Sequence, residues 1–138
     1  MIYERVVISS DLKFLYLTRK IILNILRKSK LSAENENKVI IAIDEAVSNV
    51  IEHSHGFQRH KPIDLVINSN EKKIQITISN KGKCFNPRTV CKPDIMESIK
   101  EGKKRGLGVF LIRQVMDKVQ YSFKNGQNKL ILVKYITK

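Results

Sequence analysis

Alternating apolar and polar positions predict a pair of strands in the middle of the chain. Isoleucine or leucine occupies every second position at 63, 65 and 67 and again at 74, 76 and 78. Successive side chains of a strand point to opposite faces, so this period of two indicates strands with one buried face. The polar stretch at 68–71 has the composition of a turn, and the two segments therefore predict a β-hairpin.

Two further regions have strand character. The segment 2–9 contains three consecutive β-branched residues and predicts a short strand near the start of the chain. Near its end, the segments 119–123 and 129–136 flank Asn125-Gly126, a dipeptide that favours tight hairpin turns.

Apolar residues at helical spacing predict three helices. The first is expected from Ser10-Asp11, which offers an N-cap, to about Ser29. The second is expected from an N-cap at Ser32 to about Ser54, and the third from Gly106 or Leu107 to about Lys118. The resulting order is β-α-α-β-β-loop-α-β-β.

This order of elements predicts the fold class. Hairpins dominate the connections between strands, so we expect a mixed but mostly antiparallel sheet. Amphipathic helices need an apolar surface to cover, which favours a two-layer α/β (α+β) sandwich with helices on one face of the sheet. A length of 138 residues suits one domain, expected here to span residues 1–138.

The charge of the chain raises the question of nucleic-acid binding. The 26 Lys and Arg residues against 13 Asp and Glu give a formal net charge of +13, an excess that is typical of proteins with anionic partners. The basic residues are nevertheless spread from Arg5 to Lys138, and aromatic residues make up 7% of the chain without an interleaved stacking platform. We therefore expect a solvated basic surface and no direct contact with nucleic acid.

Other features of the composition bear on localisation. No apolar run approaches the roughly 20 residues that cross a bilayer. Glu4 and Arg5 stand where a signal peptide would need its apolar stretch. The two cysteines, Cys84 and Cys91, do not form a disulfide framework. We expect a cytoplasmic protein without membrane contact.

The second predicted helix carries the first candidate site. Glu45, Asn49 and His53 recur four residues apart and form one polar stripe, opposite a stripe of apolar residues. A carboxamide at Asn49 can ligate magnesium without adding charge, and Glu45 one turn away can accept a proton from an attacking hydroxyl. The alternative interpretation is an ordinary solvated helix face.

Two glycine-containing segments are further candidates. Arg105-Gly106-Leu107-Gly108 opens the third helix, where free backbone N–H groups and the helix dipole favour an anion such as phosphate. Asn80-Lys81-Gly82 follows a strand and places a carboxamide at its end. Taken singly, each segment is equally compatible with a tight turn or an ordinary loop.

In this order and spacing, the three segments resemble the nucleotide-binding boxes of the GHKL ATPase superfamily. Glu45, Asn49 and His53 are similar to its N box, Asn80 with Gly82 to its first glycine box, and Arg105–Gly108 to its second. The small size and the segment at 106–119 more narrowly resemble the anti-sigma factor serine kinases of bacterial partner-switching systems.

The resemblance implies a histidine-kinase-like ATPase fold that binds ATP and Mg²⁺. Glu45 would be the catalytic base, Asn49 the magnesium ligand, and His53 a residue at the border of the site. Asn80, Gly82 and the segment Arg105, Gly106, Leu107 and Gly108 would bind the nucleotide beneath a lid at about 85–104. The implied partners are a sigma factor, a STAS-domain anti-anti-sigma protein whose serine is phosphorylated, and a second copy of the chain in a homodimer.

Three positions depart from the family pattern. Asn80 replaces the usual aspartate that accepts a hydrogen bond from adenine, Cys84 replaces a glycine of the first box, and Lys104 a glycine of the second. Loss of a charge-assisted hydrogen bond is expected to weaken adenine binding by about 1.5–3 kcal/mol. Two alternatives to an active kinase remain: a binding module that acts by sequestration only, and an isolated histidine-kinase ATPase domain.

Overall fold

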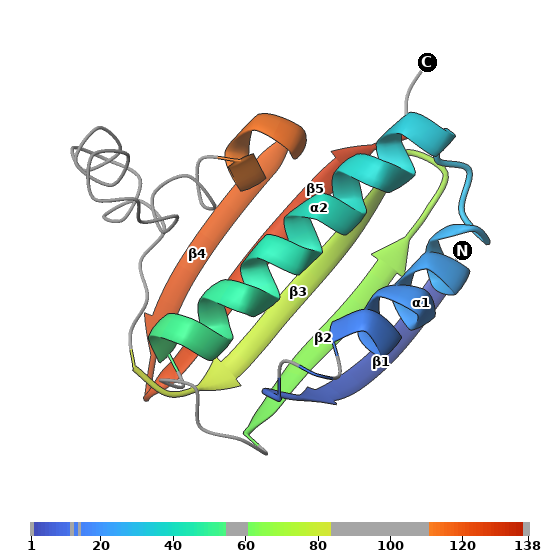
Figure 1. Cartoon of the computed structure of the whole chain (residues 1–138). Helices are drawn as coiled ribbons and strands as arrows, with labels where there is room; N and C mark the ends of the chain where they lie inside the picture. Colours follow the sequence, from blue (N-terminus) through green and yellow to red (C-terminus); the bar gives the residue numbers. More distant parts are fainter. Residues whose placement is uncertain (1, 12, 14, 55–60, 84–110, 137–138) are drawn as a thin grey trace, which may run out of the picture.

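A computed structural model of the chain describes residues 2–11, 13, 15–54, 61–83 and 111–136. Its strands are β1 (Ile2–Ser9), β2 (Pro62–Ser69), β3 (Lys73–Lys81), β4 (Lys118–Lys124) and β5 (Gln127–Tyr135). They form one sheet in the order β1-β2-β3-β5-β4, and the helices cover one face of it (Figure 1). The predicted two-layer α+β sandwich is confirmed. Each of the four strand pairings in the described residues is antiparallel.

The core lies between this sheet and the helices. In the register of β2 and β3, Leu65 faces Ile78 and Ile67 faces Ile76. The alternating side chains that the sequence pattern assigned to the buried face are at most 2% exposed: Ile63, Leu65, Ile67, Ile74, Ile76 and Ile78. Burying one such side chain stabilises the fold by about 1.5–3 kcal/mol, so this row sets the register of the two central strands.

Helix α1 (Leu15–Leu26) is shorter at both ends than the apolar spacing predicts. Of the predicted cap residues Ser10 and Asp11, the carboxylate of Asp11 accepts a hydrogen bond from the N–H of Lys13 at 3.2 Å. Ser10 instead extends the sheet, because its N–H donates to the carbonyl of Lys61 at 2.9 Å. At the other end, the hydroxyl of Ser29 donates to the carbonyl of the last helical residue at 2.5 Å. That side-chain bond satisfies a terminal carbonyl and ends the helix three residues before the predicted boundary.

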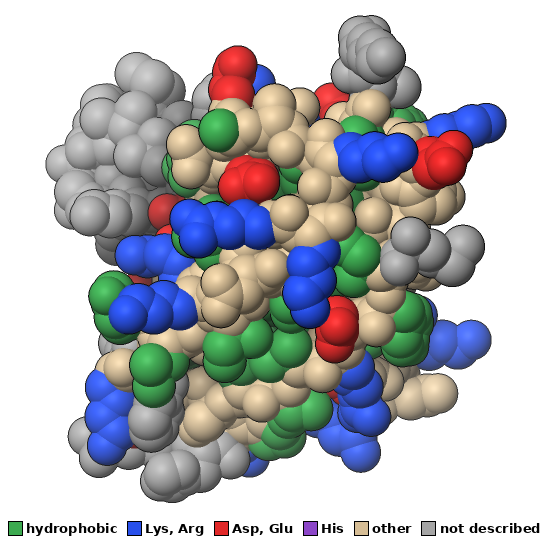
Figure 2. Space-filling model, turned by 90° about the vertical axis from the view of Figure 1, so that its right-hand side faces the viewer, with side chains coloured by type: hydrophobic (Ala, Val, Ile, Leu, Met, Phe, Trp, Pro, Cys, Tyr) green, Lys and Arg blue, Asp and Glu red, His purple; other side chains and the backbone are tan. Residues whose placement is uncertain are grey.

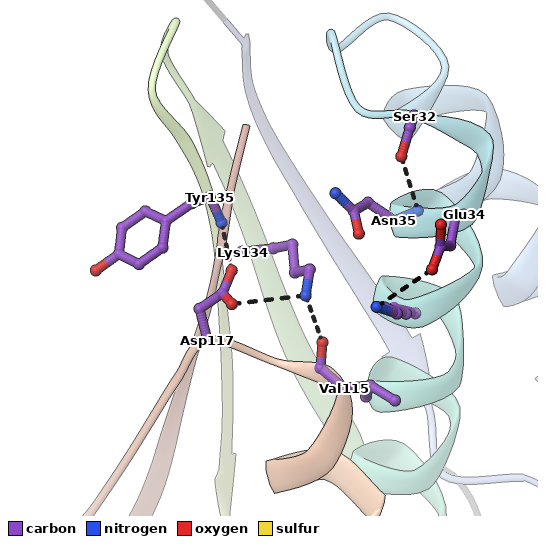
Figure 3. Close-up of polar contacts among 8 residues, drawn as sticks. Ser32, Glu34, Asn35, Val115, Asp117, Lys134 and Tyr135 are labelled. Carbon is purple, nitrogen blue, oxygen red and sulfur yellow. Dashed lines mark hydrogen bonds and ion pairs between the residues drawn. The ribbon is translucent and has the colours of Figure 1, made fainter. Parts of the chain in front are cut away.

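Helix α2 (Ala33–Asn49) begins at the predicted cap. Ser32 accepts a hydrogen bond from the backbone N–H of Asn35 at 3.1 Å (Figure 3). The helix continues into a π-helical turn, η2 (Val50–Ser54), so the two elements together cover the predicted span. A π turn inserts an extra residue into the helical repeat and turns the side chains at its start relative to the preceding face.

The hairpin between β4 and β5 turns at the predicted dipeptide. Asn125 and Gly126 have φ angles of 54° and 75°, the left-handed conformation that a type I′ turn requires at both central positions. Strand β5 starts two residues earlier than predicted. Asn128 therefore lies within the strand, directly opposite Asn80 of β3.

Residues 111–115 are helical and form the described part of the third predicted helix. The helix ends before the predicted position because the N–H of Asp117 already donates to the carbonyl of Val133 on β5, at 2.9 Å. The amine of Lys134, a residue only 8% exposed, donates to the carbonyl of Val115 at 2.8 Å (Figure 3). It also lies 3.6 Å from the Asp117 carboxylate, so a buried lysine ties the helix end to the sheet.

Figure 2 views the edge of the molecule that carries β1 and α1. On this face Lys and Arg side chains are interleaved with acidic and apolar ones and do not gather in one patch. In the part of the chain that the structure describes, no helix is long and apolar enough to cross a membrane.

Candidate functional site

Helix α2 carries Glu45 and Asn49, two residues of the predicted polar stripe, to the end of the sheet at which β3 ends. Its apolar face is fully packed, with Ala46 and Val47 at most 2% exposed. Asn49 is also buried, at 5% exposure, whereas Glu45 one turn earlier is half-buried. A carboxamide that is buried next to an apolar helix face is not part of a solvated surface. The burial of Asn49 therefore argues against the alternative that this polar stripe is an ordinary solvated helix face.

A pocket lies between this part of α2, the sheet and the helical segment 111–115. Its cavity volume is about 20 Å³, and it opens on one side to solvent. Its walls are mainly apolar, formed by Ala46, Val50, Ile78, Ile112, Val119 and Leu130. Four uncharged polar side chains also line it: Asn49, Asn80, Tyr121 and Asn128. Apolar walls with a few convergent polar groups are typical of small-molecule sites.

A chain of hydrogen bonds connects the sheet side of the pocket to the loop after β3. The hydroxyl of Tyr121 donates to the amide oxygen of Asn128, and the Asn128 amide nitrogen donates to the carbonyl of Lys83 at 2.8 Å. The N–H of Gly82 donates to the carbonyl of Gly126 at 3.1 Å. The first glycine segment is thereby held against the β4–β5 hairpin.

Two buried amide atoms in this pocket test whether it suits a ligand. The amide nitrogen of Asn49 has no hydrogen-bond partner among the described residues, and neither does the amide oxygen of Asn80, a residue that is otherwise bonded. Burying a polar atom without a partner is costly, and such atoms are uncommon in native proteins. Their position at one pocket fits a polar ligand that bonds to these amides.

The structure thus brings two of the sequence-predicted residues together, because Asn49 and Asn80 line the same pocket. Glu45 lies one helical turn before Asn49 and does not itself line the pocket. The backbone of His53 belongs to η2. Its side chain lies outside the described residues, as do the whole second glycine segment, Arg105, Gly106, Leu107 and Gly108, and the predicted lid at 85–104.

Sequence reasoning missed Tyr121 and Asn128. Nothing in the sequence near these positions indicates a site, because Tyr121 reads as part of an ordinary strand and Asn128 as part of a turn. They reach the pocket through the pairing of β3 with β5, whose sequences are about 50 residues apart. For Asn80, which was predicted, the alternation gave a further signal, because Asn80 continues the inward-facing series of Ile74, Ile76 and Ile78.

The comparison with protein families agrees with this geometry. The model of the histidine kinase-like ATPase domain matches residues 8–134. The chain therefore belongs to the family of histidine kinase-like ATPase domains.

Its curated relatives include bacterial protein kinases. It is 22% identical over 108 residues to the serine/threonine-protein kinase BtrW of Bordetella bronchiseptica, covering 78% of this chain and 76% of that protein. It is 33% identical over 106 residues to the serine-protein kinase RsbW of Staphylococcus aureus strain RF122, covering 71% of this chain and 64% of that protein. The match therefore spans somewhat less than two thirds of the staphylococcal relative.

Solved structures share the fold. The RsbU and RsbW domains of a Mycobacterium tuberculosis protein align with a TM-score of 0.69 at 11% identity, over 97% of this chain and 32% of that one. The SiaB–SiaC complex of Pseudomonas aeruginosa aligns with a TM-score of 0.61 at 12% identity, over 94% and 89%. At 11% and 12% identity, these two structures show that the fold is shared and nothing more.

Proposed function

We propose that the chain binds ATP with Mg²⁺ in the pocket beneath α2 and transfers the terminal phosphoryl group to a serine of a STAS-domain anti-anti-sigma protein. When it is not bound to the STAS-domain protein, the chain binds a sigma factor and holds it inactive. The observation that carries this proposal is the convergence of Asn49 and Asn80 on one buried, uncharged pocket. The family and the names of the kinase relatives support the same activity.

Each described site residue has a distinct part in this proposal. The apolar walls of the pocket contact the flat adenine ring of ATP, and Asn80 accepts a hydrogen bond from adenine. Asn49 offers its amide oxygen to Mg²⁺, which when bound neutralises charge on the phosphates. The unpartnered end of Asn49 is assigned as the nitrogen, and only the oxygen of an amide can ligate Mg²⁺, so this role requires the amide to be rotated with Oδ1 in that place. Glu45 accepts the proton of the attacking serine hydroxyl.

The remaining predicted residues complete the site. We assign the backbone of Gly82, Gly106 and Gly108 to close approach to the nucleotide, and Arg105 with Leu107 to the phosphate end. His53 borders the site, and 85–104 forms the lid.

Isothermal titration calorimetry with Mg-ATP tests nucleotide binding. Wild type is expected to bind, and Asn49→Ala to lose most of the magnesium-dependent part of the affinity. Asn68→Ala, the same change at an exposed position of β2, serves as the matched control and should bind like wild type. Absence of a binding signal with millimolar Mg-ATP in wild type would show that the pocket is not a nucleotide site.

Phosphoryl transfer is tested separately, with purified STAS-domain proteins from the same genome and labelled ATP. Glu45→Ala should bind Mg-ATP nearly as well as wild type but lose transfer, because a base acts only in the transition state. Glu71→Ala, at an exposed turn, is the control. Wild type that binds ATP and a sigma factor without phosphorylating any STAS-domain protein would identify the sequestration-only module instead.

Assembly is a further part of the proposal. Light scattering coupled to size-exclusion chromatography is expected to give the mass of a homodimer. A monomer that still binds nucleotide and both partners would remove the second copy from the proposed mechanism.

A further inference from the structure

The three neighbouring strands β3, β5 and β4 contain lysines but no Asp or Glu. Their lysines are Lys73, Lys81, Lys118, Lys124, Lys129 and Lys134. Lys134 points to the side of the helices, where it bonds the Val115 carbonyl. Because side chains alternate along a strand, the other five belong to the opposite face, called here the outer face. The described helices all lie on the other side of the sheet (Figure 1).

The lysines of the β4–β5 hairpin differ from other cations of the chain in their partners. On the outer face of β1 and β2, Arg5 is paired with Asp64 at 2.6 Å. By contrast, Lys118, Lys124 and Lys129 form no ion pair among the residues that the structure describes. Their charge is therefore available to a group from outside the chain.

Lys124 and Lys129 are close neighbours on this hairpin. Lys124 is the register partner of Gln127, which lies two residues before Lys129 on β5. Such diagonal neighbours are about 7–8 Å apart, a separation at which two positive charges repel each other. The residue directly opposite Lys129 on β4 is the uncharged Ser122. An anion bound between the two lysines would relieve this repulsion.

Two hollows of the surface meet at Lys129. The first has a volume of about 320 Å³ and is lined by Gln120, Tyr121, Ser122, Lys129 and Ile131. The second has a volume of about 260 Å³ and is lined by Ser122, Lys124, Asn125, Gln127 and Lys129. Hydroxyl and carboxamide groups in both can donate hydrogen bonds beside the lysine ammonium groups. A carboxylate in either hollow would therefore meet a positive charge together with neutral donors.

The composition of this face favours a protein segment over other anions. Tyr121 and Phe123 belong to the helix-facing side of β4, so the outward positions from 118 to 131 carry no aromatic residue on which a nucleic-acid base could stack. Ile131 is the one aliphatic residue at these outward positions, which is little apolar surface for insertion into a membrane. Binding of carboxylates needs neither feature.

We propose that the outer face of the β4–β5 hairpin, centred on Lys124 and Lys129, binds an acidic segment of a partner protein. Carboxylates of the segment occupy the two hollows and lie between the two ammonium groups. The surface is on the opposite side of the sheet from the pocket beneath α2, so the segment binds with or without nucleotide. The inference goes beyond the proposed kinase activity and does not depend on it.

Fluorescence anisotropy with a labelled peptide of alternating glutamate and serine tests the inference on the full chain. Wild type should bind this peptide and not its counterpart with glutamine in place of glutamate. Affinity should fall about fivefold or more when salt is raised from about 0.05 to about 0.3 M, because salt screens exposed charges. Addition of Mg-ATP should leave the affinity within about twofold.

The double variant Lys124→Gln, Lys129→Gln should bind the acidic peptide about fivefold more weakly, as expected for the loss of two exposed ion pairs. The matched control is Lys28→Gln, Lys30→Gln, which removes the same charge at exposed positions between α1 and α2 and should stay within about twofold of wild type. Lys124→Arg, Lys129→Arg keeps both charges and should retain binding, so it tests the same face if the glutamine variant does not fold.

Three results would overturn the inference. Wild type might bind the acidic peptide no better than the glutamine peptide. Equal losses in the test and control variants would mean that binding follows net charge and not this face. Single-stranded DNA or phosphatidylserine vesicles that bind through Lys124 and Lys129 while the peptide does not would assign the face to a different partner. Failure of wild type to bind Mg-ATP would instead contradict the proposed function alone.

Discussion

Removal of the buried amine of Lys134 is expected to destabilise the fold through the end of the helix at 111–115. Lys134→Met keeps the apolar stem and deletes the amine that bonds the Val115 carbonyl at 2.8 Å. Because the lysine side chain is only 9% exposed, water replaces the lost donor poorly. A hydrogen bond to a charged group contributes about 1.5–3 kcal/mol, and we take about 2 kcal/mol as the expected loss.

This loss translates into a measurable shift of the melting temperature. Unfolding entropy is about 2.1 cal/mol/K per residue, which gives roughly 0.29 kcal/mol/K for 138 residues. A loss of about 2 kcal/mol therefore lowers the melting temperature by about 7 °C, measured by calorimetry on the protein without ligand.

Two further variants are expected to lose less stability than Lys134→Met. The Asp117 carboxylate accepts a hydrogen bond from the Tyr135 N–H at 2.7 Å. Asp117→Asn keeps an oxygen for this bond and loses only the 3.6 Å ion pair with Lys134. With the Asp117 side chain 34% exposed, that change should cost less than about 1 kcal/mol. Lys129→Met, on the solvent side of β5, should cost almost nothing. A melting temperature for Lys134→Met within about 1 °C of Lys129→Met would refute the reasoning, because the Val115 carbonyl would then lose nothing.

Three other changes have definite expectations. Ser32→Ala removes the cap of α2 and should cost about 1 kcal/mol in urea unfolding; an unchanged midpoint would mean that the 3.1 Å bond contributes nothing. Gly126→Ala meets no atom within 4 Å, so its cost of about 1–2 kcal/mol should come from the φ of 75° alone, and equal stability would contradict that. Asn80→Asp should lower the melting temperature of the free protein by burying a carboxylate at a position 4% exposed, and tighten ATP binding by up to tenfold in calorimetry. Weaker ATP binding in this variant would mean that Asn80 does not accept from the base.

The elements of the fold were predictable because their signals are local. The alternation at 63–67 and 74–78, the cap at Ser32 and the turn at Asn125-Gly126 each depend on residues adjacent in the chain, and each prediction is confirmed. The errors lie at boundaries where a distant partner competes. Of the predicted cap residues Ser10 and Asp11, Ser10 forms a hydrogen bond with Lys61 of the sheet, and the N–H of Asp117 bonds to Val133 instead of extending a helix.

The candidate site likewise has a part that is visible in the local sequence and a part that depends on long-range strand pairing. Asn49 and Asn80 were recognisable from motif spacing, because residue type and separation along one helix or one strand end are visible in the sequence. Their common pocket, and the polar groups opposite them, depend on the insertion of β5 between β3 and β4.

From the sequence alone follow the periodicity of most strands and helices, several caps and turns, and the polar stripe of Glu45, Asn49 and His53 that resembles an N box. The tertiary structure decides which of those residues are buried together. Tyr121 and Asn128 become pocket residues, and Lys134 a buried helix cap, only through pairing between strands far apart in the chain. The physical reason is that periodicity tells which face of an element is buried, whereas the long-range pairing of the strands determines which other side chains that face meets.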